Sequence, residues 1–161
     1  MFGFLNKKLE LSALANGKLI AIEDVADNVF SSKTMGDGFA VQPTSGDIYA
    51  PVTGTITTVF PTKHAFGIKT PQGFEVLVHL GVDTVELEGK PFEVFVSVND
   101  QVNPATKIAS MDLEAIKEAG KETDAIVVFT NAENPTLTIN GIGEDVKAQQ
   151  TIGELKAKIK K

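Results

Sequence analysis

Short apolar runs, broken at close intervals by turn residues, dominate this sequence. The runs are rich in Val, Ile, Phe and Thr and have the lengths of β-strands. They cover residues 18–22, 39–42, 53–60, 74–80, 125–130 and 136–139. Gly, Pro, Asn and Asp interrupt them, for example at residues 36–38, 44–47, 71–73 and 131–135. Many short strands at this spacing predict an all-β fold, either an antiparallel β-sandwich or a barrel.

One segment has a helical period instead. Leu113 and Ile116 are spaced as on one face of a helix and follow Asp112, a residue type that often caps a helix N-terminus. Gly120 is placed to end that helix. The pattern therefore predicts one short helix here, and residues 23–28 favour a second helix of a single turn.

Composition fits one globular domain. The chain has 161 residues, of which 42% are apolar and 22% charged, and a domain of this size can bury roughly two-thirds of its extended surface. No segment has the length and polarity of a linker, so we expect residues 1–161 to form a single domain with residues 1–10 as a flexible tail. No apolar run approaches the roughly 20 residues that span a bilayer. The N-terminus does not resemble a secretory signal, and we expect a cytoplasmic, non-transmembrane protein.

Charge and cysteine content exclude several classes of function. Fifteen basic and 21 acidic residues give a net charge of −6. Because an acidic chain without a basic stripe repels phosphates, nucleic acid is not an expected partner. All the basic residues are lysines, so the protein has no guanidinium to grip a phosphoryl group in a bidentate manner. The absence of Cys excludes disulfides, thiolate nucleophiles and Cys-ligated metals.

The main candidates for nucleophilic or metal-binding side chains are therefore the only two histidines, His64 and His79. Between them lies Thr70-Pro71-Gln72-Gly73, whose Pro and Gly positions predict a β-turn, so the flanking runs should form an antiparallel hairpin. Neighbouring imidazoles suit phosphoryl transfer through a phosphohistidine, a zinc site or general acid–base catalysis. The alternative is that both histidines are incidental surface or core residues.

The register of this hairpin decides whether the two rings can meet. A two-residue loop places His64 directly opposite His79 on one face of the sheet. A three-residue loop pairs Thr70 with Phe74, which matches charges and apolar residues near the tip but sends the histidines to opposite faces unless a bulge intervenes. The pattern near the tip favours the second register. The residues of the hairpin alone do not decide whether the His64 and His79 rings are in contact.

Five ordered blocks of sequence form a wider pattern. They lie at residues 22–30, 35–41, 50–56, 64–68 and 76–87, and the last of them, VLVHLGVDTVEL, is the most specific. In this order they resemble the glucose-type enzyme IIA proteins of the bacterial phosphoenolpyruvate-dependent sugar phosphotransferase system, over nearly the whole chain. The resemblance implies an antiparallel β-sandwich, a single IIA domain of type 1, and contact between the two histidine rings.

The resemblance also implies a role for particular residues. His79 corresponds to the histidine that is phosphorylated in the family, and His64 to the one that hydrogen-bonds the phosphoryl group. A shallow apolar depression surrounds the site in relatives, and acidic residues at its edge pair with cationic side chains of the donor. The depression maps onto Val29, Phe30, Phe60, Phe66 and Val85, and the acidic edge onto Asp27 and Asp83.

Partners follow from the same resemblance. The donor is the phosphocarrier protein HPr and the acceptor is the IIB domain of a sugar permease, with regulatory targets left open. No cofactor is implied and no metal is required, although His64 and His79 could bind zinc adventitiously or with a partner. Lys63 stands where relatives carry Asn, and Thr34 and Met35 stand where they carry aliphatic residues, which affects partner choice more than chemistry.

Other functions stay open beside this one. The main alternative is a metalloenzyme on a related β-scaffold, with His64, His79 and Asp83 as zinc ligands. A carrier of the biotin or lipoyl type would need Lys69 or Lys90 as its attachment site, and neither lies in a recognisable acceptor motif. The sequence does not name the sugar or the oligomeric state. Because the chain begins with Met and comprises one IIA unit, it favours a free-standing protein over a domain excised from a permease.

Overall fold

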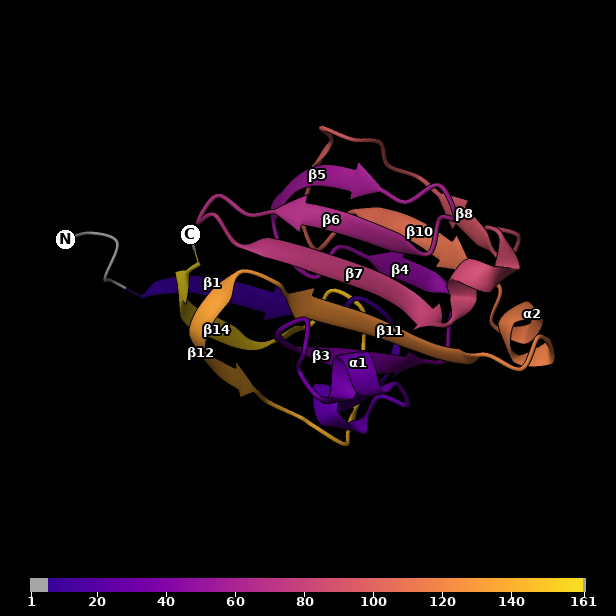
Figure 1. Ribbon diagram of the computed structural model, residues 1–161, viewed down its shortest axis with the longest axis horizontal. Helices are drawn as coiled ribbons and strands as arrows, with labels where there is room; N and C mark the ends of the chain where they lie inside the picture. Colours follow the sequence, from indigo (N-terminus) through magenta and orange to yellow (C-terminus); the bar gives the residue numbers. More distant parts are fainter. Residues whose placement is uncertain (1–5, 161) are drawn as a thin grey trace.

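The computed structural model describes residues 6–160 (Figure 1). About half of this part of the chain is β-strand, with two short α-helices and two 3-10 helices. The strands are β1 (Lys7–Ser12), β2 (Gly17–Ala21), β3 (Asp37–Pro43), β4 (Asp47–Tyr49), β5 (Gly54–Val59), β6 (Ala65–Lys69), β7 (Glu75–Val82), β8 (Phe92–Val94), β9 (Gln101–Val102), β10 (Lys107–Met111), β11 (Glu122–Phe129), β12 (Ala132–Ile139), β13 (Asp145–Val146) and β14 (Thr151–Ile159). The helices are η2 (Ile22–Asp24), α1 (Asn28–Ser31), η3 (Thr84–Leu87) and α2 (Leu113–Glu118).

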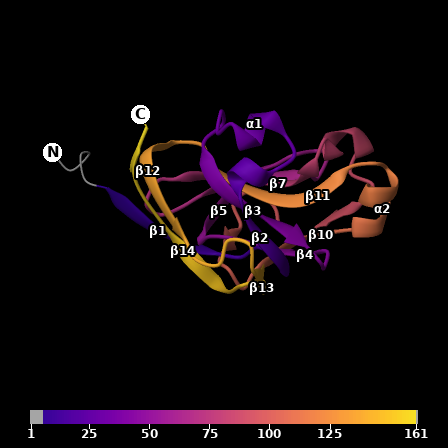
Figure 2. The ribbon, with the colours of Figure 1, turned by 90° about the horizontal axis from the view of Figure 1, so that it is seen from below.

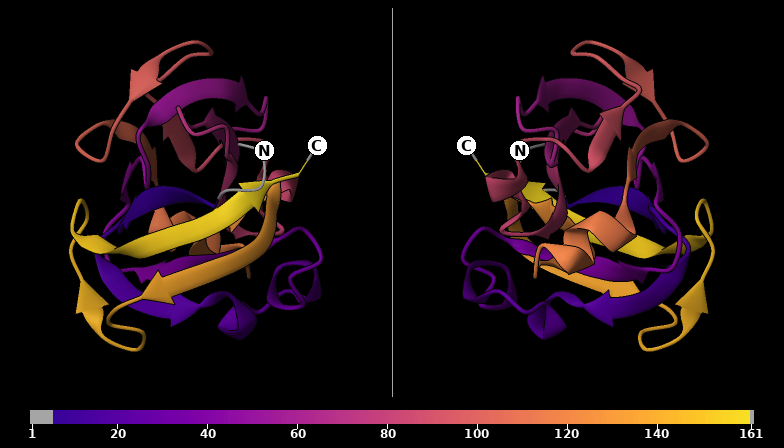
Figure 3. Two further views of the ribbon diagram at one scale, coloured as in Figure 1. Left: turned by 90° about the vertical axis from the view of Figure 1, so that its left-hand side faces the viewer. Right: turned by 90° about the vertical axis from the view of Figure 1, so that its right-hand side faces the viewer.

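Three antiparallel sheets enclose the core. The largest has the order β13-β2-β3-β11-β7-β6-β5-β9, and two smaller sheets have the orders β1-β14-β12 and β4-β10-β8. Strands β14 (yellow) and β12 (orange) lie side by side at one end of the molecule (Figure 3). The edge strands β13 and β9 of the large sheet do not pair with each other, so the described chain contains no closed barrel. The predicted antiparallel sandwich is confirmed.

The central strand β7 is covered on both faces. Val76, Val78 and Leu80 alternate along it and join the main apolar core, which includes residues from all three sheets. The opposite face carries Leu77 and His79, and there a second, smaller cluster gathers residues of η2, α1 and the neighbouring strands. Helix α1 lies over this outer face of the large sheet (Figures 1 and 2). His79 therefore sits beside a small local core and not within the main one.

The predicted helix after Asp112 is confirmed. The Asp112 carboxylate accepts a hydrogen bond from the Ala115 N–H at 3.1 Å and so caps α2. Gly120 follows the helix with a φ of +77°, a conformation that glycine adopts without steric cost. The single turn expected over residues 23–28 is instead split into η2 and α1, because Asp27 caps a new helix by accepting from the Val29 N–H at 2.8 Å.

The β6–β7 hairpin has the second of the two predicted registers. Lys69 pairs with Glu75, and the pairing continues without interruption to Ala65 opposite His79. At the tip, the Thr70 N–H donates to the Phe74 carbonyl and the Gly73 N–H donates to the Thr70 carbonyl, each at 2.9 Å. The three-residue loop thus closes as its sequence predicts.

The expectation of a flexible tail over residues 1–10 is wrong for residues 7–10. These residues belong to β1, which pairs with β14, because the alternation of Leu9 and Leu11 places both side chains in the main core. Gln72 at the hairpin tip also donates to the Lys8 carbonyl at 3.0 Å. Residues 1–5 lie outside the described residues. No helix within residues 6–160 is long and apolar enough to cross a membrane.

Candidate functional site

Four aromatic rings form a continuous row on the outer face of the large sheet. The rings of His64 and His79 touch edge to face, with centroids 4.9 Å apart and an interplanar angle of 83°. The Phe30 ring lies 4.9 Å from that of His79, and the Phe60 ring lies 5.5 Å from that of His64. The ring contact implied by the family resemblance is therefore present.

Contact occurs in spite of a register that was expected to separate the rings. The pair opposite His79 is Ala65, the first residue of β6, so His64 lies outside the strand. It belongs to a tight turn in which the Lys63 N–H donates to the Phe60 carbonyl at 2.8 Å and Lys63 has a φ of +62°. Strict alternation of side chains holds only within a strand. The turn therefore frees the His64 ring to meet His79.

The His79 ring has a defined tautomer. Its Nδ1 lies 2.7 Å from the carbonyl oxygen of Gly81. Because a carbonyl can only accept, Nδ1 must carry the proton and donate it. The neutral ring then keeps its lone pair on Nε2, and the side chain is partly exposed. The Nδ1 atom of His79 is thus engaged in a hydrogen bond, whereas Nε2 carries no proton. Apolar groups surround the ring.

His64 is held from two directions. Its Nδ1 forms a hydrogen bond of 2.6 Å with Oγ1 of Thr62, and its main-chain carbonyl accepts from the Leu80 N–H at 2.7 Å. The side chain is buried, at 5% exposure. Thr62 and Gly81 were not found from the sequence, although each lies two residues from a histidine. That short spacing is the signal that could have identified both ring partners.

The surroundings of both imidazoles favour the neutral form of the ring. Burial, and then the nearby His64 ring, lower the pKa of His79 from 6.5 to about 4. The Gly81 carbonyl, Asp27 and Asp83 oppose that shift, in decreasing order. Burial also lowers the pKa of His64. At neutral pH His79 is therefore unprotonated at Nε2 and able to act as a nucleophile.

The apolar residues expected around the site differ in how far they are exposed to solvent. Val29, Phe60 and Val85 are 49%, 38% and 49% exposed and form an accessible rim. Phe30 is almost buried and packs against the His79 ring. The assignment of Phe66 to this surface is wrong: it pairs with Val78, faces the main core and is fully buried. A partner at this face could not touch it.

Two carboxylates stand near the rings, as expected. Asp27 is half-buried and caps α1, whereas Asp83 is exposed and precedes η3 with a φ of +59°. Within residues 6–160 no three His, Cys, Asp or Glu side chains are arranged to hold a metal ion. His64, His79 and Asp83 therefore do not form the ligand set that the zinc hypothesis requires.

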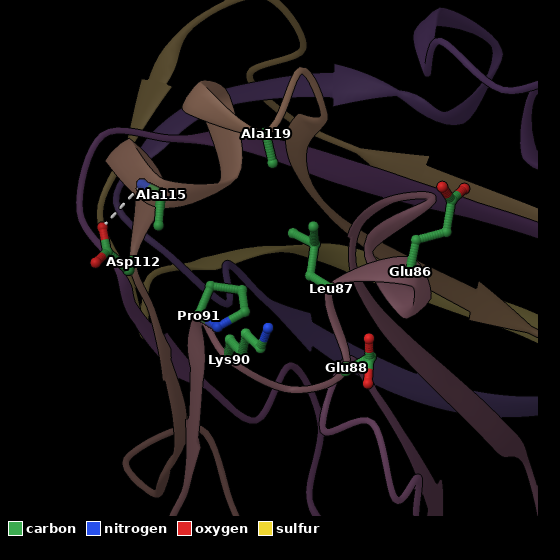
Figure 4. Close-up of a pocket in the computed structure, with 8 residues that line it drawn as sticks. All are labelled: Glu86, Leu87, Glu88, Lys90, Pro91, Asp112, Ala115 and Ala119. Atoms are coloured by element: carbon green, nitrogen blue, oxygen red, sulfur yellow. Dashed lines mark hydrogen bonds between the residues drawn. The ribbon is translucent and has the colours of Figure 1, made fainter.

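A separate pocket of about 320 Å³ lies between η3 and α2 (Figure 4). Leu87 points into it, with Pro91, Ala115 and Ala119 around it and acidic side chains near its margin. Neither histidine lines this pocket. Its walls come from two separate segments, residues 86–91 and 112–119, so no single local pattern indicated it.

Comparisons with known proteins show the family and the fold of this chain. Residues 9–135 match the family described as phosphoenolpyruvate-dependent sugar phosphotransferase system, EIIA 1. A solved structure of glucose permease IIA from Mycoplasma capricolum superposes with a TM-score of 0.83 and 41% sequence identity, and the match covers 92% of this chain and 96% of that one.

Two relatives show the range of chains that contain such a unit. The glucose-specific EIIA component of Mycoplasma capricolum subsp. capricolum is 42% identical over 153 residues, which are 95% of this chain and 99% of that protein. The glucose-specific EIICBA component of Streptococcus pneumoniae serotype 4 is 53% identical over 124 residues. Those residues are 77% of this chain but only 17% of that much longer protein.

Proposed function

The chain belongs to the EIIA 1 family of the phosphoenolpyruvate-dependent sugar phosphotransferase system and is a phosphocarrier of that system; we propose that His79 is the residue that carries the phosphoryl group. The observation that carries this proposal is the hydrogen bond from His79 Nδ1 to the Gly81 carbonyl. It leaves Nε2 with a free lone pair on a partly exposed face.

The transfer step follows from that tautomer. The Nε2 lone pair of His79 attacks the phosphorus of the donor, and an N–P bond forms. The bond between phosphorus and the donor atom breaks, and its electron pair returns to the donor group. Nδ1 keeps its proton throughout, and the Gly81 carbonyl stabilises the positive charge that the ring acquires. Transfer to the acceptor is the same exchange in reverse.

His64 is proposed to stabilise the phosphoryl oxygens. When the Thr62 hydroxyl donates to Nδ1 of His64, the ring proton resides on Nε2. That N–H can donate to a phosphoryl oxygen on the neighbouring His79, since the ring centroids are only 4.9 Å apart. One such donor is typically worth about 100-fold to 1000-fold in rate.

The surroundings suit a relay that passes its cargo on. The chain contains no Arg, so it cannot clamp the phosphoryl group by a bidentate guanidinium contact. Tight binding of that group would stabilise the phosphorylated state and slow its release. A cation brought by the partner can complete the site. Exposed Val29, Phe60 and Val85, with Asp27 and Asp83 beside them, offer an apolar docking surface with negative charge at its edge.

The partners proposed for this face are HPr as donor and a sugar-permease IIB domain as acceptor. Both would dock on the rim around His79 in turn, because each must bring its own phosphoryl site to the same Nε2 atom. Glucose is the sugar named for the relatives, and we extend it to this chain as part of the proposal. The proposed compartment is the cytoplasm.

Incubation with phosphoenolpyruvate, enzyme I and HPr tests the assignment. We expect one phosphoryl group per chain, stable in alkali and labile in acid, on a peptide that contains His79. The His79→Ala variant should remain unlabelled, while His64→Ala should still acquire label slowly. Label on Ser or Thr, or no label in the presence of active phospho-HPr, would contradict the proposal.

A further inference from the structure

The end of β7 departs from regular strand geometry just beyond His79. Gly81 has a φ of +81° and Asp83 one of +59°, both in the left-handed region. The partner strand β11 is also irregular here, because Glu122 pairs with Val82 but Ala125 pairs with Leu80. The Gly81 carbonyl that accepts the hydrogen bond from His79 Nδ1 therefore lies where the β7–β11 pairing is interrupted, and another contact must fix its direction.

Thr84 makes two contacts at this position. Its hydroxyl donates to the Leu80 carbonyl at 2.5 Å. This hydrogen bond restrains the peptide unit that joins Leu80 to Gly81. Its methyl group closes the space beside Gly81, since a Cβ atom there would lie 2.4 Å from Cγ2 of Thr84. The Thr84 side chain is fully buried. One side chain thus restrains Gly81 both through a hydrogen bond and through packing.

We infer that Thr84 is a positioning residue for His79: it holds the Gly81 carbonyl toward Nδ1 and so keeps Nε2 free for the phosphoryl group. Thr84 acts through Leu80 and Gly81 and has no role of its own in the transfer. The inference rests on the proposed function, because a fixed tautomer matters for transfer only if His79 is the acceptor.

The opposite end of the same hairpin supplies a matched control. Thr70 is also buried, at 4% exposure, and its hydroxyl accepts from the Phe74 N–H at 3.1 Å. It contacts neither histidine. Loss of the Thr70 hydroxyl should therefore reproduce the general cost of removing a buried hydrogen bond from this hairpin, without any effect on the His79 ring.

The test is to record the ring ¹⁵N shifts of His79 at pH 7, in unphosphorylated protein without partners. Thr84→Val should shift His79 from a single Nδ1–H tautomer toward a mixture with a large Nε2–H population. Thr84→Ser keeps the hydroxyl and should retain the wild-type tautomer, as should Thr70→Val. Phosphoryl acceptance from phospho-HPr should fall on the order of tenfold in Thr84→Val and recover in Thr84→Ser.

An unchanged tautomer in Thr84→Val, with a loss of stability equal to that of Thr70→Val, would overturn the inference and leave Thr84 a purely structural residue. If Thr84→Val does not fold, the smaller Thr84→Ala variant allows the same comparison, with the same expectation. Because the tautomer is measured without any donor, failure of wild-type protein to accept phosphate would refute the proposed function separately.

Discussion

The β6–β7 hairpin has two ends of different character. At the tip, Thr70 and Gly73 close a loop of the length that their sequence indicates, and the strands beside it pair regularly. At the base, the chain leaves the regular pairing on both strands, with left-handed residues at Lys63, Gly81 and Asp83. Both ends contain a buried threonine with a hydrogen-bonded hydroxyl, yet both histidines lie at the base.

The difference shows what irregular backbone contributes to a site. Inside regular pairing, side chains alternate between faces and each carbonyl is directed toward the neighbouring strand. Such geometry could place His79 on the outer face, but could not turn His64 toward it or aim the Gly81 carbonyl at Nδ1. The regular part of the hairpin places His79 on the outer face, and the irregular base sets the orientation of the His64 ring and of the Gly81 carbonyl.

The largest effect should come from the histidines at the base. His79→Ala should abolish phosphoryl acceptance, because no other side chain here can supply an imidazole. His64→Ala should slow it by about 100-fold to 1000-fold through loss of one donor, and His64→Gln, which keeps an N–H donor, should be milder. Rates from phospho-HPr and to IIB measure each step. Equal and complete loss in His64→Gln and His79→Ala would make the two histidines a single functional unit.

Two glycine substitutions should separate the cost of backbone strain at positive φ from the cost of a steric clash with the new Cβ atom. Gly73→Ala at the tip and Gly81→Ala at the base both place a side chain at positive φ, which costs about 1–2 kcal/mol. The Cβ atom at Gly73 would meet nothing closer than 3.9 Å, whereas at Gly81 it would approach the Glu122 carbonyl at 2.9 Å as well as Thr84. Urea unfolding should show at least about 3 kcal/mol lost for Gly81→Ala, with transfer impaired only in that variant.

Charge reversal should affect docking at the base alone. Asp83→Lys places a cation where the proposed partner also brings cations, and should slow acceptance from phospho-HPr severalfold while removing its sensitivity to salt. Glu75→Lys makes the same charge change on β7 near the tip and should leave the rate unchanged. Stopped-flow or quench measurements at two salt concentrations test this. A slower Glu75→Lys would mean that the docking surface extends along the hairpin.

The smallest effect should be the pH dependence of wild-type stability. Two titratable groups at the base of the hairpin, His79 and Asp124, change the stability with pH in opposite directions. The folded-state pKa of His79 is depressed to about 4, so this group makes stability rise with pH between about 4 and 6.5. Burial, and then Glu122, raise the pKa of Asp124 on β11 to about 6, so this group makes stability fall as pH rises through about 4 to 6. Each contributes on the order of 2 kcal/mol.

Single variants should reveal the two opposing contributions. His79→Gln should lose stability as pH rises from about 4 to 6, because only the Asp124 contribution remains. Asp124→Asn should gain stability as pH rises over the same window, and should exceed wild type at pH 7. Denaturant unfolding at several pH values measures both slopes. Parallel slopes in the two variants would show that the groups are not shifted in opposite directions.

Local patterns in the sequence predicted much of the fold. The predicted apolar runs coincide with β2, β3, β5, β7, β11 and β12, whereas β10 and β14 were not predicted. These six strands, α2 and the hairpin tip follow from short apolar runs, an Asp cap and a Pro-Gly turn, each of which acts over a few residues. Strand β1 was missed because Leu9 and Leu11 alternate over only a short stretch, and their burial depends on β14, nearly 150 residues away. The long-range partner, and not the local propensity, decides that this segment is ordered.

The site was predicted less evenly. The family resemblance predicted a site at His64, His79 and the neighbouring carboxylates, which do lie together, but it also assigned Phe66 to the partner face, although this residue pairs with Val78 and is buried in the core. Ring contact could not be derived from alternation, because it depends on where β6 begins. The end of a strand is set by tertiary hydrogen bonds, such as that from the Leu80 N–H to the His64 carbonyl.

The outermost strands of the large sheet have a consequence for behaviour in a crowded solution. Strands β13 and β9 have two residues each, so neither edge offers another chain a long row of free N–H and C=O groups. At the edge of a smaller sheet, β1 begins with exposed Lys7 and Lys8, whose charges discourage strand addition. Both edges of the large sheet and the β1 edge of the smaller one are therefore poor templates for the addition of a strand from a second molecule.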